Sequence, residues 1–317
     1  MEIKQILKKQ GGIKLLKQYW SGGALFTAIG EFLLLGKSRT ALEILRLSTQ
    51  LKIKQKLYRC YKKELNRFDK NWNDNLVHES SNKVWICWFQ GIEKAPLLVQ
   101  KCYQSVVDNM PEKEIILITS KNMFEYVQLP EYIIKKWEKG IITHTHMTDL
   151  LRLELLIKYG GLWLDATVFC SGKDIPDYFF DSDLFLFQCL KPGRDGHANY
   201  VSSWLMEAKT NNKILMATRE LCYAYWKDNN DMWDYFLMHD FITIVLEQYQ
   251  DEAKAIIPRD NATPHILLLR LFEKYDENTW NDIKSQTQFH KLTYKFEKSK
   301  EKISGTYYDI LFKQKED

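Results

Sequence analysis

The sequence predicts an α/β protein with a mixed, mainly parallel sheet that is flanked by helices. Apolar, strand-like runs alternate with helical segments after residue 83, as at 83–90, 97–107 and 114–119, and this alternation is typical of a largely parallel sheet. The stretch 148–169 then joins a leucine-rich helix to a mostly apolar run, which indicates a strand covered on both faces. Hydrophobic residues make up 45% of the 317-residue chain, enough to build such a core.

The stretch 148–169 has recognisable ends. We expect Thr148 to cap the helix, because its hydroxyl can accept a hydrogen bond from a backbone N–H that lacks a helical partner. Gly160 and Gly161 end the helix, since glycine readily adopts the left-handed conformation that is common at helix C-termini. A single buried strand is then predicted at 162–169.

Further segments complete the predicted order of elements. A strand is expected at 183–190, and residues 200–208 are expected to lead into a helix. Two more helices are predicted at 210–226 and 234–249. The tail from Lys291 has no pattern that indicates a chemical role.

Asp165 is a carboxylate in an otherwise apolar run. Burying an ionised and unpaired Asp is costly, so we expect Asp165 to lie at an open strand end, beside a cation or on a metal. Asp149 and Arg152 are three residues apart in the predicted helix and therefore share a face. One interpretation is a structural ion pair with Asp165 as a turn residue, and the other is a functional site.

The functional interpretation is favoured by a resemblance that these residues carry. The pattern Asp149-x-x-Arg152, an apolar helix and Tyr159-Gly-Gly-Leu-Trp-Leu-Asp165 resembles the signature of sugar-nucleotide glycosyltransferases with a GT-A fold. It is most similar to bacterial capsular polysaccharide synthesis proteins and their relatives that contain Asp-x-Asp. The resemblance implies a hexosyltransferase that moves a sugar from a nucleoside diphosphate to a polysaccharide or a lipid-linked oligosaccharide in capsule or surface-glycan synthesis.

The resemblance also implies roles for individual residues. The sequence Trp-Phe-Gln-Gly after the first strand resembles a nucleotide-binding segment of the family. The expected nucleotide-sugar site comprises Trp88, Gln90, Asp149, Arg152, Gly161 and Asp165. Asn199 and Ser203 are expected on the acceptor side.

Asp165 and Asp240 are the two expected catalytic residues. Asp165 would hold the metal or the donor sugar, and Asp240 would act as a general base if the enzyme inverts the anomeric centre. The nearest relatives with Asp-x-Asp are retaining enzymes, in which no such base is needed. Both stereochemical outcomes stay open.

A divalent cation, Mn²⁺ or Mg²⁺, is the cofactor that the resemblance implies, with Asp165 and His239 as its expected ligands. The relatives commonly carry Asp-x-Asp, whereas this chain has Asp165-Ala-Thr167. Such ions prefer hard oxygen ligands, and a neutral hydroxyl binds them more weakly than a carboxylate. The alternative is a metal-independent transferase of the same fold, in which basic residues replace the ion.

The charges divide the chain into a basic helical region at 1–70, a polar linker at 71–82 and a GT-A-like domain at 83–317. Residues 1–70 contain 16 Lys and Arg against 5 Asp and Glu. Basic amphipathic helices bind anionic lipid head groups, so one interpretation is a membrane-surface arm and the other is an ordinary helical cap. Nucleic acid is not an expected partner, because no recognised binding module accompanies the charge.

The expected partners are a UDP- or GDP-sugar donor, a glycan or lipid-linked acceptor and an anionic membrane surface. The N-terminal sequence lacks the features of a secretory signal, and six scattered cysteines favour reduced thiols. We therefore expect a cytoplasmic protein that is peripheral at the inner face of the cell membrane. A non-catalytic assembly subunit at the membrane is the alternative from another functional class.

Overall fold

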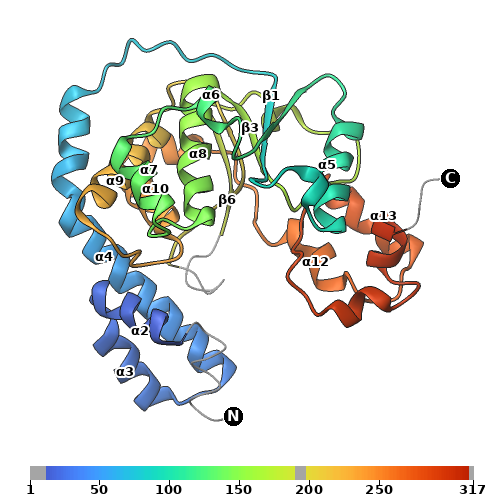
Figure 1. Ribbon diagram of the computed structural model, residues 1–317, viewed down its shortest axis with the longest axis horizontal. Coiled ribbons are helices and arrows are strands. Elements are labelled where there is room, and N and C mark those ends of the chain that lie inside the picture. Colours follow the sequence, from blue (N-terminus) through green and yellow to red (C-terminus); the bar gives the residue numbers. More distant parts are fainter. Residues whose placement is uncertain (1–11, 190–197, 314–317) are drawn as a thin grey trace.

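The computed structural model describes residues 12–189 and 198–313, and a five-stranded sheet lies at its centre (Figure 1). The sheet order is β2-β1-β3-β6-β5. Its strands are β1 (Lys83–Cys87), β2 (Glu114–Ile118), β3 (Gly161–Asp165), β5 (Leu184–Gln188) and β6 (Val201–Ala208). Since β1 is parallel to β2 and β3, and β6 is antiparallel to β3 and β5, only β6 runs in the opposite direction. The predicted α/β class and mainly parallel sheet are confirmed.

Helices cover both faces of the sheet (Figure 1). Alternate side chains of β1 enter different cores, because successive residues of a strand point to opposite faces: Trp85 faces one core and Ile86 the other. The first face packs against α6 (Met123–Tyr126), α7 (Glu131–Glu138), α8 (His144–Tyr159), α9 (Lys213–Asp228) and α10 (Leu237–Gln248). The second face packs against α5 (Leu97–Asn109). The sheet is thus buried on both sides.

The predicted strand at 162–169 is two strands in two different sheets. β3 ends at Asp165, and after a turn the chain enters β4 (Val168–Cys170), which pairs antiparallel with β7 (Phe289–Lys291). This small sheet joins the C-terminal lobe, which contains α12 (Ile266–Arg270) and α13 (Glu277–Gln286) around a third core (Figure 1). Asp165 therefore lies at an open strand end, as expected.

Two other local predictions are wrong. Thr143, not Thr148, caps the central helix: its hydroxyl accepts from the backbone N–H of His146 at 3.2 Å, and Thr148 lies one turn inside α8. The segment predicted to lead into a helix at 200–208 instead forms strand β6 over Val201–Ala208. Periodicity alone cannot separate a short buried strand from a buried helix, and seven of the eight residues of β6 are buried.

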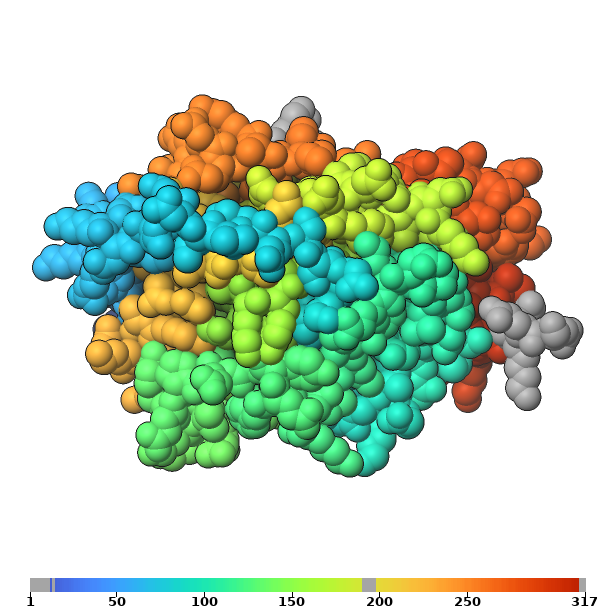
Figure 2. All heavy atoms as spheres, turned by 90° about the horizontal axis from the view of Figure 1, so that it is seen from above, coloured from blue at the N-terminus to red at the C-terminus, as the bar shows by residue number. Residues whose placement is uncertain are grey.

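The N-terminal region consists of α2 (Gly12–Ser21), α3 (Leu25–Leu35) and α4 (Arg39–Asn71). The boundary predicted at residue 70 falls at the end of α4, and Ile53 and Leu65 of this helix belong to the core that covers the first face of the sheet. Residues 72–82 then run extended over the surface (Figure 2). Within the described ranges, no helix is long and apolar enough to cross a membrane.

Gly161 has a structural role that a methyl group would destroy. Its φ is +93°, a backbone conformation that favours glycine, and a Cβ there would overlap the carbonyl oxygen of Lys83 in β1. We predict that Gly161→Ala lowers the free energy of unfolding by more than about 2 kcal/mol. Gly172→Ala, where a Cβ meets open space without a positive φ, is the control and should change it by less than about 0.5 kcal/mol. Equal urea midpoints for the two variants would contradict this role.

Glu207 of β6 makes the stability of the fold dependent on pH. It is fully buried, and neither carboxyl oxygen has a hydrogen-bond partner among the described residues. Burial raises its pKa from 4.5 to about 9, despite the opposing charge of Lys113. The folded state binds this proton more tightly than the unfolded state does. The resulting stabilisation of the fold is therefore complete below pH 4.5 and is lost as the pH rises toward 9.

Glu207→Gln should remove this dependence, since an amide does not titrate. Between pH 4.5 and pH 7, the wild type should lose about 3 kcal/mol of unfolding free energy relative to this variant. Urea titrations at both pH values measure the difference. The exposed Glu112→Gln is the control and should follow the wild type. Parallel pH profiles of the wild type and Glu207→Gln would show that Glu207 is ionised in the fold.

Candidate functional site

Two adjoining cavities lie at the edge of the sheet where β1 and β3 end, which is where ligands bind in open α/β sheets. Their volumes are about 580 Å³ and about 360 Å³, within the range of small-molecule sites. Six residues line both cavities: Thr145, Arg152, Asp165, Tyr235, His265 and Lys291. Trp88 and Gln90 line only the larger one, and Asn199 and Ser203 only the smaller one. Trp88 and Gln90, expected to bind the donor, are thus separated from Asn199 and Ser203, expected on the acceptor side, by the residues that both cavities share.

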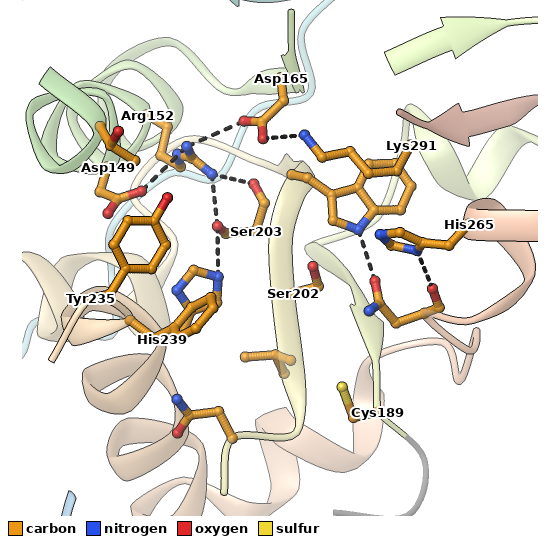
Figure 3. Close-up of a pocket in the computed structure, with 16 residues that line it drawn as sticks. Asp149, Arg152, Asp165, Cys189, Ser202, Ser203, Tyr235, His239, His265 and Lys291 are labelled. Atoms are coloured by element: carbon orange, nitrogen blue, oxygen red, sulfur yellow. Dashed lines mark hydrogen bonds and ion pairs between the residues drawn. The ribbon is translucent and has the colours of Figure 1, made fainter. Parts of the chain in front are cut away.

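Asp165 stands in this shared wall between two cations (Figure 3). Its Oδ1 accepts from Arg152 Nη2 at 3.3 Å and from Trp163 Nε1 at 3.2 Å, and its Oδ2 accepts from Lys291 Nζ at 2.7 Å. Burial acts to raise the pKa of this carboxyl, but the charges of Lys291 and Arg152 outweigh it and the pKa is lowered. Asp165 is therefore a carboxylate at neutral pH, with 27% of its side chain exposed to the cavities.

Arg152 holds three elements together. From α8 its guanidinium reaches Asp165 at the end of β3, and its Nη1 donates to the backbone oxygen and the hydroxyl of Ser203 in β6, the latter at 2.7 Å. Its Nη2 also lies 3.2 Å from Asp149 Oδ1, and its plane approaches the Trp163 ring. Arg152 is buried and its donors are already engaged, so it positions Asp165 rather than offering itself to a ligand.

Asp149 is a buried part of the same network. Besides Arg152, it contacts His146 Nδ1 at 3.2 Å, and both His146 and Asp149 are less than 9% exposed. The Asp149–Arg152 pair predicted from the sequence is therefore present. Asp149 borders the smaller cavity only, away from the wall formed by Trp88 and Gln90.

Lys291 is the site residue that the sequence did not indicate. It ends β7, and its Nζ donates to Asp165 at 2.7 Å and to the Thr167 hydroxyl at 2.8 Å. The pairing of β4 with β7 places Lys291 beside Asp165. In this pair Val168 lies opposite Lys291, and the Leu292 N–H donates to the Thr167 backbone oxygen at 3.0 Å. No local pattern around Lys291 could have identified it, because its partner lies 126 residues earlier in the chain.

The side chains around Asp165 do not fit a divalent-ion site. Both carboxylate oxygens of Asp165 already accept from cationic groups, and the Thr167 hydroxyl accepts from Lys291. His239, the other expected ligand, has its Nε2 3.0 Å from the Ser203 hydroxyl. Over residues 12–189 and 198–313, no group of three or more His, Cys, Asp or Glu is arranged to hold a metal.

Two residues expected in the site lie outside it. Asp240 is fully buried and lines neither cavity; burial raises the pKa of its carboxyl well above the ordinary value, and Asn199 donates to it at 2.8 Å. A neutral, enclosed acid cannot serve as the general base. Gly161 begins β3 whereas Asp165 ends it, so Gly161 packs against β1 and lines neither cavity.

Aromatic and basic side chains form the outer part of the larger cavity. Trp88 and Tyr294 meet edge to face, with 5.5 Å between ring centroids, and both line the cavity with Lys295. The smaller cavity is lined by polar groups such as Ser202 and Asn261 together with the aromatic rings of Trp204 and Phe236. The Asp165–Lys291 pair lies where the two cavities meet.

Comparisons with known proteins agree with the sequence resemblance. The family profile described as capsular polysaccharide synthesis protein matches residues 38–311. The O-glycosyltransferase PaGT of Phomopsis amygdali is 26% identical in an alignment of 174 residues that covers 48% of this chain and 40% of that protein. This chain therefore spans less than half of the relative's length.

Among solved structures, the PaToxG glycosyltransferase is similar with a TM-score of 0.37 and 13% identity, over 64% of this chain and 81% of that chain. The family profile, in contrast, covers most of this sequence and confirms the resemblance. The chain belongs to the capsular polysaccharide synthesis protein family.

Proposed function

We propose that the protein is a glycosyltransferase that moves a sugar from a nucleoside diphosphate to a glycan or lipid-linked oligosaccharide acceptor. The observation that carries this proposal is the junction of two adjoining cavities at the Asp165–Lys291 pair. A transferase needs a donor site and an acceptor site that meet at the reacting bond. Membership of the capsular polysaccharide synthesis family supports the same activity.

The larger cavity is the better place for the nucleotide. Trp88 and Tyr294 offer aromatic faces and edges, and aromatic side chains bind planar bases well by stacking. The ammonium groups of Lys291 and Lys295 line the same cavity, where they would offset the charge of a diphosphate. Gln90 is exposed at the end of this wall and can hydrogen-bond the base or ribose.

The smaller cavity suits the transferred sugar and the acceptor. Its side chains include the hydroxyl of Ser202 in β6 and the amides of Asn199, just before β6, and Asn261 in a later loop. Groups of this kind exchange hydrogen bonds with sugar hydroxyls as both donors and acceptors. Ser203 is held by Arg152 and His239, so its part in acceptor binding is to shape the wall.

Retention of the anomeric configuration is the stereochemical outcome that we propose. The described carboxylates that line the two cavities are Asp149 and Asp165, and each is ion-paired with Arg152. Neither pairing suits a general base, which must accept a proton near neutral pH. Because Asp240 is enclosed, the inverting alternative loses its expected base.

Asp165→Asn should lower the rate of sugar transfer at least 100-fold, because removing the charge frees Lys291 and Arg152 from their shared partner. Initial rates with a panel of UDP- and GDP-sugars and an oligosaccharide acceptor measure this effect. Asp240→Asn is the matched control and should keep at least a third of the wild-type rate, since Asp240 is already neutral and buried.

The assembly-subunit alternative makes the opposite prediction for these variants. A non-catalytic scaffold would show no transfer with any donor, and Asp165→Asn would leave its partner binding unaffected. Loss of transfer in Asp240→Asn but not in Asp165→Asn would also contradict the assignment of roles. Circular dichroism and melting temperatures establish that both variants are folded.

We also propose that α3 rests on an anionic membrane surface. Phe26, Leu33 and Leu34 are 80%, 77% and 83% exposed, and with Ile29 they follow helical spacing on one face. α3 lies beyond the α/β body at the lower left of Figure 1. The region 1–70 is strongly basic, which is the charge that complements anionic lipid head groups.

Phe26→Ser/Leu33→Ser should reduce binding to phosphatidylserine vesicles at least 10-fold, because two buried apolar contacts with lipid are lost. Leu269→Ser is the control, since Leu269 is an equally exposed leucine (78%) on α12. Vesicle flotation at two salt concentrations measures binding and its ionic component. Unchanged flotation of the double variant would assign this face to another partner. So would light scattering in which the wild type is a dimer and the double variant is a monomer.

A further inference from the structure

The Asp165-Ala-Thr167 segment binds a cation of the chain itself, the ammonium group of Lys291. In the related Asp-x-Asp pattern both side chains are carboxylates, whereas here the second is the hydroxyl of Thr167. Lys291 Nζ lies 2.7 Å from Asp165 Oδ2 and 2.8 Å from Thr167 Oγ1. The ammonium therefore occupies the position between the first and third side chains of the segment.

The position of Lys291 is fixed by the backbone. Val168 and Lys291 are opposite residues in the β4–β7 pair, and the Leu292 N–H donates to the Thr167 oxygen at 3.0 Å. The lysine stem is largely buried, with 18% of the side chain exposed. An ammonium has three N–H donors. Asp165 and Thr167 accept two of them, and Lys291 is a lining residue of both cavities.

A divalent ion would meet poor ligands and an adverse charge at this position. It would have to displace the ammonium from Asp165 and Thr167 while Arg152 keeps its contact with the other Asp165 oxygen. The displaced ammonium would stay close to the ion, because β7 holds its backbone beside β4. The single carboxylate of Asp165, which is shared with Arg152, would offset little of the repulsion between the ion and the ammonium.

We propose that the ammonium of Lys291 takes the place of a divalent cation and binds the diphosphate of the donor, so that transfer does not require a metal. This inference rests on the proposed transferase function and concerns the same site. Arg152 cannot fill this role, because its donors are engaged by Asp165, Asp149 and Ser203. Lys291 is, besides Arg152, the Lys or Arg among the described residues that lines both cavities.

The chemical step balances without an ion. The bond between the anomeric carbon of the sugar and the diphosphate oxygen breaks, and that carbon forms a bond to an acceptor hydroxyl oxygen. The hydroxyl proton passes to the departing diphosphate, which keeps the electron pair of the broken bond. Lys291 stays protonated throughout and stabilises the negative charge that develops on the leaving oxygen.

The first experiment measures transfer in EDTA and in millimolar Mn²⁺, with the donor that gives turnover. The expected rates agree within twofold. Activity that appears only with Mn²⁺ would overturn the inference and leave the transferase function intact. No transfer in either condition, together with no donor-induced rise in melting temperature, would instead overturn the proposed function itself.

Variants of Lys291 test which group supplies the positive charge. Lys291→Ala should raise KM for the donor and lower kcat/KM at least 100-fold, in EDTA and in Mn²⁺ alike, while Lys291→Arg should keep part of the activity. Lys298→Ala, an exposed lysine of the same lobe, is the control and should match the wild type. A wild-type kcat/KM in Lys291→Ala would overturn the inference.

The double variant Thr167→Asp/Lys291→Ala provides a readout that does not depend on activity. It replaces the ammonium with a second carboxylate and should bind Mn²⁺ in isothermal titration calorimetry, whereas the wild type should show no heat of Mn²⁺ binding. Stoichiometric Mn²⁺ binding by the wild type in the absence of donor would overturn the inference. If the double variant does not fold, the wild-type titration and the EDTA comparison still decide the question.

Discussion

The carboxylate of Asp165, held between Arg152 and Lys291, is the interaction on which the site depends. Arg152 reaches it from α8 at 3.3 Å and Lys291 reaches it from β7 at 2.7 Å. These two contacts connect the helix that covers the first face of the sheet with the C-terminal lobe on the other side. A partly exposed charge is tolerable at this strand end because both partners are positive and because the carboxylate borders a cavity.

The same arrangement explains why the chain leaves the central sheet after Asp165. A strand that continued to residue 169 would carry the carboxylate into the sheet interior, where it would be fully enclosed. Instead the chain turns and β4 pairs with β7, so the C-terminal lobe is attached beside the site. In this respect the third core around α12 and α13 supports Lys291 as well as the stability of the lobe.

Sequence patterns were sufficient for the part of the site that lies within one helix–strand unit. Asp149, Arg152 and Asp165 could be associated because helical spacing and a following buried strand bring them together. Trp88 could be added because parallel strands end at a common edge of the sheet. Lys291 could not be added, since only the antiparallel pairing of two short and distant strands brings it to Asp165.

The wrong predictions have physical causes of the same kind. A carboxylate in an apolar segment, as at Asp240, indicates either function or burial, and its complete burial behind Asn199 depends on tertiary packing. Residues 200–208 mix Ser202, Ser203 and Glu207 with apolar residues, and such a short segment fits either a strand or a helix. The segment forms a strand because β6 pairs antiparallel with both of its neighbours in the sheet, β3 and β5.

The most direct test of this account is a structure of the protein with a nucleoside diphosphate, from crystals grown in Mn²⁺ and measured at a wavelength that detects manganese. The account predicts a diphosphate oxygen about 2.7–3.1 Å from Lys291 Nζ, a base beside Trp88 and no manganese signal at Asp165. A manganese ion between Asp165 and the diphosphate, with Lys291 turned away, would contradict it.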